Sequence, residues 1–99
     1  MATAPLATEY VIARELKALS EVPAVGSIHV LPTQNAFAVW IGISSDNREV
    51  RNAIYHFEDD ISERYTHVLF DFHVIPVPPG RKMEDFITDA QPLFQRSIA

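Results

Sequence analysis

The stretch "HVLFDFHVIP", residues 67–76, alternates between two kinds of side chain and therefore predicts a β-strand. Successive side chains of a strand point to opposite faces of a sheet. The apolar set is Val68, Phe70, Phe72 and Val74, and the mixed set is His67, Leu69, Asp71, His73 and Ile75. The strand can thus cover a core with one face and present polar groups among apolar ones on the other.

Two strands and two amphipathic helices are predicted before this stretch. Residues 24–31 and 36–43 are separated by turn-forming residues and read as a β-hairpin. A first helix is predicted from about residue 9 to residue 20. A second helix follows Asp46 and Glu49, which have the spacing of a capping box. Its apolar stripe consists of Val50, Ile54, Phe57 and Ile61.

This order predicts one α+β domain over residues 1–99, built as a two-layer sandwich. We expect the order α-β-β-α-β with a short C-terminal helix near residues 83–89, a three-stranded sheet, and both main helices on one face. The third strand should run parallel to the second and antiparallel to the first. The sequence does not determine which of these two strands it borders in the sheet. Residues 1–7 are predicted as a loose arm and residues 77–99 as a C-terminal extension.

Composition narrows the classes of function. The formal net charge is −5 and the few basic residues are scattered, which argues against nucleic-acid binding. No stretch approaches the roughly 20 apolar residues of a membrane helix, and the N-terminus lacks the pattern of a signal peptide. The chain has no cysteine, so disulfides and thiolate metal sites are excluded. We expect a cytoplasmic protein.

The sheet face that the helices leave uncovered is the candidate interaction surface. On the predicted strands it carries Leu31, Trp40, Leu69 and Ile75. A face that mixes large apolar groups with an aromatic anchor suits a protein–protein interface. A homodimer is the economical expectation, because one two-fold contact covers both faces. The alternative is that the C-terminal segment folds back over this face.

The same face carries the candidate metal ligands His29, His73 and Asp71, which would suit Zn²⁺ or another divalent cation. Whether His29 and His73 meet depends on strand order, because an intervening strand would separate them by about 10 Å. A third hypothesis is a small enzyme with an Asp71/His73 acid–base pair. No serine elbow and no phosphate-binding loop occurs, so no catalytic residue is assigned.

Residues 9–76 resemble the cytoplasmic C-terminal domain of cation diffusion facilitator transporters. The resemblance rests on "VGSIHVL" (residues 25–31), "AFAVWIGI" (residues 36–43), the helical run from Arg48 to Tyr65, and "FDFHVIP" (residues 70–76). It implies a small α+β metallochaperone-like fold that dimerises, and it places His29 and His73 at two of the family's ligand positions. The layout is also similar to that of small bacterial proteins, a likeness that implies no function.

These observations rank three functions. A non-catalytic homodimeric interaction or regulatory module comes first. Divalent-metal binding or sensing through His29 and His73 comes second, and an Asp71/His73 enzyme comes third.

Overall fold

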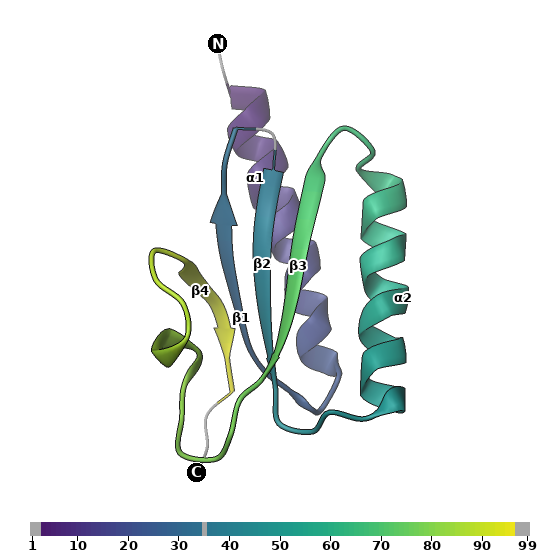
Figure 1. Ribbon diagram of the computed structural model, residues 1–99. Helices are drawn as coiled ribbons and strands as arrows, with labels where there is room; N and C mark the ends of the chain where they lie inside the picture. The colour runs from purple at the N-terminus through teal and green to yellow at the C-terminus, as the bar shows by residue number, and fades with distance from the viewer. Residues whose placement is uncertain (1–2, 35, 97–99) are drawn as a thin grey trace.

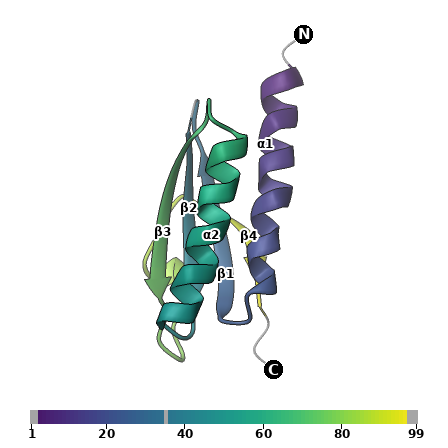
Figure 2. The ribbon, with the colours of Figure 1, turned by 90° about the vertical axis from the view of Figure 1, so that its right-hand side faces the viewer.

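Helices and strands follow one another along residues 3–34 and 36–96, which the computed structural model describes (Figure 1). The elements are α1 (Thr3–Leu16), the 3₁₀ helix η1 (Lys17–Glu21), β1 (Val25–Pro32), β2 (Ala36–Ile43), α2 (Arg48–Arg64), β3 (Leu69–Pro76), the 3₁₀ helix η2 (Met83–Asp85) and β4 (Gln91–Gln95). Both α-helices lie on the same side of the sheet (Figure 2). The α+β class is therefore as predicted.

The sheet is mixed and has four strands in the order β3-β2-β1-β4. β1 pairs with β2 and with β4 in the antiparallel sense, and β3 runs parallel to β2. The predicted direction of the third strand is confirmed, but the prediction of a three-stranded sheet is wrong. The fourth strand was not predicted because "QPLFQ" is short and contains Pro92, which lacks a backbone donor and suits only an edge strand.

The two ends of the chain also differ from the predictions. α1 already begins at Thr3, so the predicted arm is helical from there on, and residues 1–2 lie outside the described residues. Pro5 is compatible with this start because the first helical turn needs no backbone donor. After Leu16 the chain tightens into η1 instead of remaining α-helical to Ser20. The predicted C-terminal helix is reduced to the single turn η2, and β4 follows it.

α2 begins with a cap that differs from the predicted capping box. The Oδ1 of Asn47 accepts a hydrogen bond from the backbone N–H of Val50 at 3.0 Å. Asp46 instead pairs with Arg51, whose Nε lies 2.7 Å from Oδ1 of Asp46. Asn47 therefore satisfies one of the backbone donors that a helix leaves free at its first turn.

The core lies between the helices and one face of the sheet. It contains residues of both helices, of η1 and of β1 and β2, and the apolar face of β3 packs against it. The buried cluster consists of Ile12, Leu16, Leu19, Val25, Ile28, Val30, Phe37, Val39, Ile41, Ile43, Ile54 and Ile61. Phe70, Phe72 and Val74 contact it from β3, as the alternation in residues 67–76 predicts.

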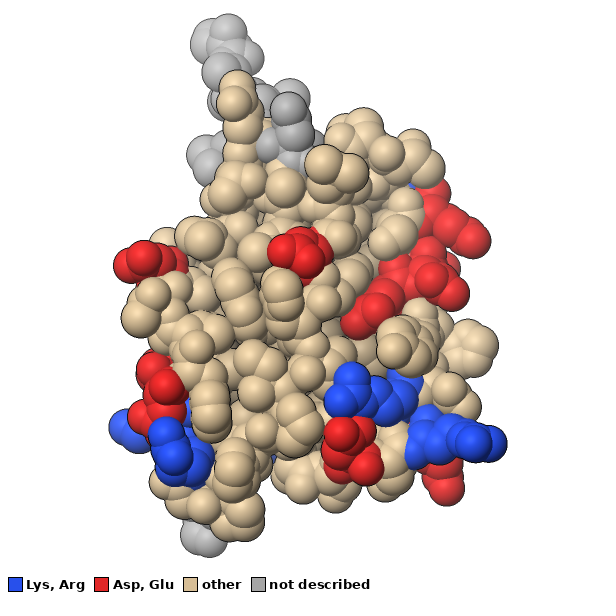
Figure 3. All heavy atoms as spheres, in the orientation of Figure 1, with Lys and Arg blue, Asp and Glu red and all other residues tan. Residues whose placement is uncertain are grey.

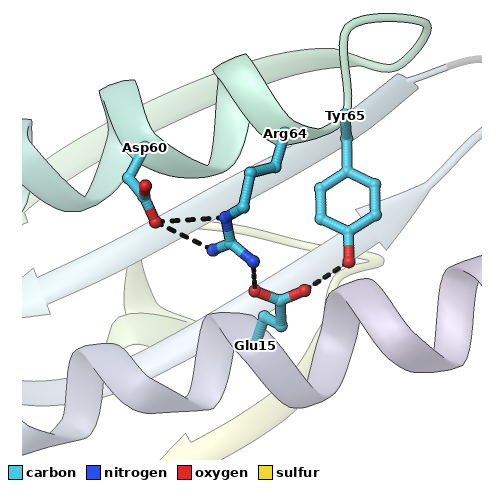
Figure 4. A network of polar contacts seen from close by, with 4 residues as sticks. All are labelled: Glu15, Asp60, Arg64 and Tyr65. Carbon is cyan, nitrogen blue, oxygen red and sulfur yellow. Dashed lines mark hydrogen bonds and ion pairs between the residues drawn. The ribbon is translucent and has the colours of Figure 1, made fainter.

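A polar network joins the two helices outside this core (Figure 4). Arg64, at the end of α2, donates hydrogen bonds to Glu15 on α1 and, at 2.9 Å, to Asp60. The hydroxyl of Tyr65 donates to the other oxygen of Glu15. The hydrogen bond from Tyr65, helped by Arg64, lowers the pKa of Glu15, and the same bond raises the pKa of Tyr65. The network therefore ties the end of α2 to α1.

We predict that Tyr65→Phe destabilises the protein at neutral pH and has little effect in acid. The pKa of Glu15 is lowered in the folded state. The network therefore adds to the free energy of unfolding above the ordinary glutamate pKa of about 4.3, and this contribution is lost as pH falls through the lowered pKa. Urea unfolding at pH 7 and at pH 3 measures this difference. Tyr10→Phe, at an exposed tyrosine of α1, is the matched control. Equal destabilisation at both pH values would contradict the prediction.

Candidate functional site

The sheet face opposite the helices is divided into a covered part and an open part. Figure 1 looks onto this face, and the chain after β3 passes in front of it before β4 joins the edge of β1. We call the uncovered part the open face; it consists of Leu31, Ala36, Ala38, Trp40, Leu69, Asp71, His73 and Ile75. In the same view the middle of the surface carries few charged groups, and most of them lie along its two sides (Figure 3).

The C-terminal segment covers the end of this face formed by Ser27, His29 and Gly42. Met83 is 2% exposed and serves as its apolar anchor. A Cβ atom on Gly42 would lie 3.0 Å from Cε of Met83 and 3.2 Å from Cγ2 of Val77. Such distances are shorter than ordinary van der Waals contacts, so glycine at this position lets the segment approach the sheet. The alternative that the C-terminal segment covers the face is thus realised for this part only.

His29 lies beneath the covering segment and is 1% exposed. Its Nε2 lies 3.2 Å from Oε2 of Glu84, which also accepts a hydrogen bond from Nε2 of Gln95 at 2.7 Å. Nδ1 of His29 is buried and has no hydrogen-bond partner among the residues that the structure describes. The pKa of Glu84 is lowered, first by the hydrogen bond from its own backbone amide and next by that from His29. His29 thus holds the covering segment through Glu84.

The two candidate metal-binding histidines do not meet within one chain. His29 is opposite Trp40 in the β1–β2 ladder, and Trp40 is opposite His73 in the β2–β3 ladder. The rings of Trp40 and His73 stack, with centroids 5.4 Å apart and planes inclined by 16°. Among the residues that the structure describes, no group of three or more histidine, aspartate and glutamate side chains could hold a metal ion.

Asp71 and His73, by contrast, do contact each other. Oδ2 of Asp71 lies 3.0 Å from Nε2 of His73. Residues two apart on a strand are about 6.5–7 Å apart along the backbone, so these side chains come together over that distance. Their exposed fractions are 70% and 43%, so water reaches the pair freely. Its position on the open face suits a surface contact better than the water-excluded setting in which general acid–base groups are tuned.

The predicted interface residues share the open face but are spread over it, with Leu69 opposite Ala36 at one end of β3 and Ile75 opposite Gly42 at the other. Leu69 is 72% exposed, and Leu31, Trp40 and Ile75 are partly buried. Leu69 and Ile75 belong to β3, while Trp40 and Leu31 continue the apolar surface over β2 and β1. The sequence therefore located these residues on one surface, although it did not indicate how much of that surface the C-terminal segment covers.

A groove of about 690 Å³ was not predicted from the sequence. It lies between the ends of β1 and β2 and the segment after β3, and basic residues at its wall are Arg81, Lys82 and Arg96. Arg81 pairs with Asp85 at 3.0 Å. Arg96 donates to the backbone carbonyls of Ser20 and Val25 at 2.8 and 3.0 Å. Arg96 thus ties the C-terminal segment to Ser20 and Val25, whereas the Arg81–Asp85 pair lies within that segment. Only the fold brings the two guanidinium groups to one groove.

Comparison with protein-family models, with curated proteins and with solved structures finds no match for this chain. The resemblance to the cation diffusion facilitator domain therefore stays a prediction. Among the described residues, no helix is long and apolar enough to cross a membrane.

We predict that Met83→Ala lowers the free energy of unfolding by about 2–3 kcal/mol, because it leaves a cavity between the C-terminal segment and Gly42. Hydrogen exchange should increase most in residues 77–95, because this segment loses its main apolar contact. Phe86→Ala, at a more exposed position of the same segment, is the control and should have a smaller effect. Equal effects of both variants would contradict the anchoring role of Met83.

A second prediction concerns Glu84 and pH. Glu84→Gln should destabilise the protein at neutral pH, and the difference from the wild type should shrink as pH falls below the ordinary glutamate pKa of about 4.3. The reason is that a lowered pKa stabilises the fold above the unfolded-state value, and this stabilisation is lost as the folded-state carboxylate takes up its proton. Thermal unfolding between pH 3 and pH 7 measures the effect. A difference that stays constant over this range would show that the Glu84 charge is not involved.

Proposed function

We propose that this protein is a non-catalytic homodimeric interaction module that contacts its second copy through the open face. The observation that carries the proposal is Leu69, which is 72% exposed on the same sheet face as Trp40, opposite Ala36 of β2. Exposed apolar groups gain free energy when a partner removes them from water, by about 1.5–3 kcal/mol for a leucine side chain. A second copy is the economical partner, because one two-fold contact serves both chains.

The composition of the open face supports this function. Trp40 is an aromatic anchor of the kind enriched in interface cores, and small Ala36 and Ala38 leave its surroundings flat. The polar members, Asp71 and His73, satisfy one another and can stay hydrated at an interface. The module would serve regulation or assembly without a reaction of its own.

The alternative of divalent-metal binding through His29, His73 and Asp71 has weaker support. His29 is buried under the C-terminal segment and its Nε2 is engaged by Glu84. Trp40 stands between it and His73, so a single chain offers one ion only Asp71 and His73. A site of this kind would need further ligands from a second chain.

We predict that the purified protein sediments as a dimer at micromolar concentration, with twice the chain mass of 11.2 kDa. Leu69→Asp should raise the dimer dissociation constant at least about tenfold, because it replaces buried apolar area by a charge next to Asp71. Analytical ultracentrifugation over a concentration series measures both quantities.

Tyr10→Asp is the matched control, because Tyr10 is also a large exposed residue but lies on α1, away from the open face. This variant should dimerise like the wild type. A wild-type protein that stays monomeric throughout the micromolar range would overturn the proposed function.

A further inference from the structure

β3 is an edge strand whose outer backbone groups are available for pairing. Among the described strands it borders only β2, and in Figure 2, which views the molecule from this side, β3 lies at the left with α2 beside it and nearer the viewer. The N–H of Val77 donates to the carbonyl of Ile43 on β2 at 2.9 Å. Backbone groups of successive strand residues point to alternate sides, so Leu69, Asp71, His73 and Ile75 bond towards β2. Those of Phe70, Phe72 and Val74 point to the free edge.

The sequence of this edge is self-complementary about Phe72. An antiparallel copy of β3 centred there places Asp71 opposite His73, Leu69 opposite Ile75 and Phe70 opposite Val74. We propose that two copies of this chain join β3 to β3 across a two-fold axis at Phe72, and that Asp71 of each copy faces His73 of the other. This inference rests on the proposed homodimer and places its contact at the free edge of β3, where Leu69, Asp71, His73 and Ile75 of the open face meet their counterparts, while Trp40 lies one strand further in.

The outward direction of the backbone groups agrees with this register. Phe72 would exchange two hydrogen bonds with its counterpart, and each Phe70–Val74 pair would exchange two more. Asp71 and His73 then form non-hydrogen-bonded pairs, in which opposing side chains approach most closely and the Asp71 carboxylate can accept a hydrogen bond from the His73 ring. Pro76 lies on the free edge just beyond these bonds, where the lack of a backbone donor limits further pairing.

Other registers lose this complementarity. A two-fold axis at Asp71 would oppose two aspartates, and an axis at His73 would oppose two histidines and set Asp71 against Ile75. An axis at Val74 would set His73 against Ile75 and leave Asp71 opposite Val77. Of these axes, only the one at Phe72 sets Asp71 opposite His73 and, at the same time, Leu69 opposite Ile75. The pattern therefore favours a second copy over an unrelated strand.

The charge distribution of α2 supports the same axis. Arg64 contacts Glu15 on α1, so the opposite flank of α2 faces the free edge at about 3.6 residues per turn. This flank carries Arg48, Arg51, Tyr55, Glu58 and Asp59. Arg48 and Arg51 lie in its first half, where Arg51 pairs with Asp46, and Glu58 and Asp59 lie in its second half. Along this side of Figure 3 the upper groups are acidic, and the lower part carries basic and acidic groups together. A two-fold axis sets α2 antiparallel to its copy, so unlike charges face each other and steer association.

Disulfide trapping tests the register directly, because the natural chain has no cysteine. Single-cysteine variants Asp71→Cys and His73→Cys, co-expressed and oxidised, should form the mixed disulfide. Leu69→Cys with Ile75→Cys should do so as well, and this pair keeps both Asp71–His73 contacts. Opposed residues have Cα atoms about 4.5–5.5 Å apart, within the range of a disulfide. Mass spectrometry distinguishes mixed from symmetric products by the masses of the two variants.

Mismatched combinations are the controls. Asp71→Cys alone, His73→Cys alone, and Leu69→Cys with His73→Cys place the sulfur atoms two residues out of register, which adds about 6.5–7 Å along the strand and should prevent the bond. Equal yields from matched and mismatched combinations would overturn the β3–β3 register. If the wild type sediments as a dimer but neither matched pair forms, the register is wrong and the homodimer stands. A monomeric wild type overturns both.

Discussion

The crossover through α2 decides which edges of the sheet remain free. It returns the chain next to β2 and parallel to it, so β1 keeps an edge for β4, and within the described part of the chain β3 has no second neighbour. The core face of all three long strands is thereby held against both helices. Because side chains alternate along each strand, the same placement sends Trp40 and His73 to the opposite face, where their rings stack. The topology thus sets both the core and the surface available to partners.

The C-terminal segment gives the face opposite the helices two different properties. Met83 and the Glu84–His29 contact bury the part above β1 and the end of β2. The covering segment runs from the end of β3 to the edge of β1, and Leu69 at the start of β3 stays 72% exposed. His29 is therefore a structural residue, held by a carboxylate, whereas His73 lies on the surface with Asp71. Both histidines lie on β-strands, but their roles differ, because burial and neighbouring groups determine what an imidazole can do.

An edge strand with an apolar outer surface is a hazard unless something protects it. β3 has eight residues, and its charged pair and Pro76 are the features that restrict how another strand can add to it. Asp71 and His73, two residues apart along β3, become partners across an antiparallel two-fold axis. A strand of this kind can accept a copy of itself in one register, while unfavourable contacts disfavour the other registers. Specificity then comes from the disfavoured registers as well as from the favoured one.

Much of this fold could be predicted from hydrophobic periodicity, because the core requires it. The alternation in residues 67–76 and the stripe of α2 correctly predicted the core side of β3 and of the helix. The sequence likewise placed Leu31, Trp40, Leu69 and Ile75 on one face. It could not determine that β3 borders β2, that "QPLFQ" forms a fourth strand, or that Glu84 reaches His29 from 55 residues away. Local patterns determine which face a side chain takes, whereas strand order and the path of the covering segment follow from contacts between distant residues, and only the tertiary structure decided them.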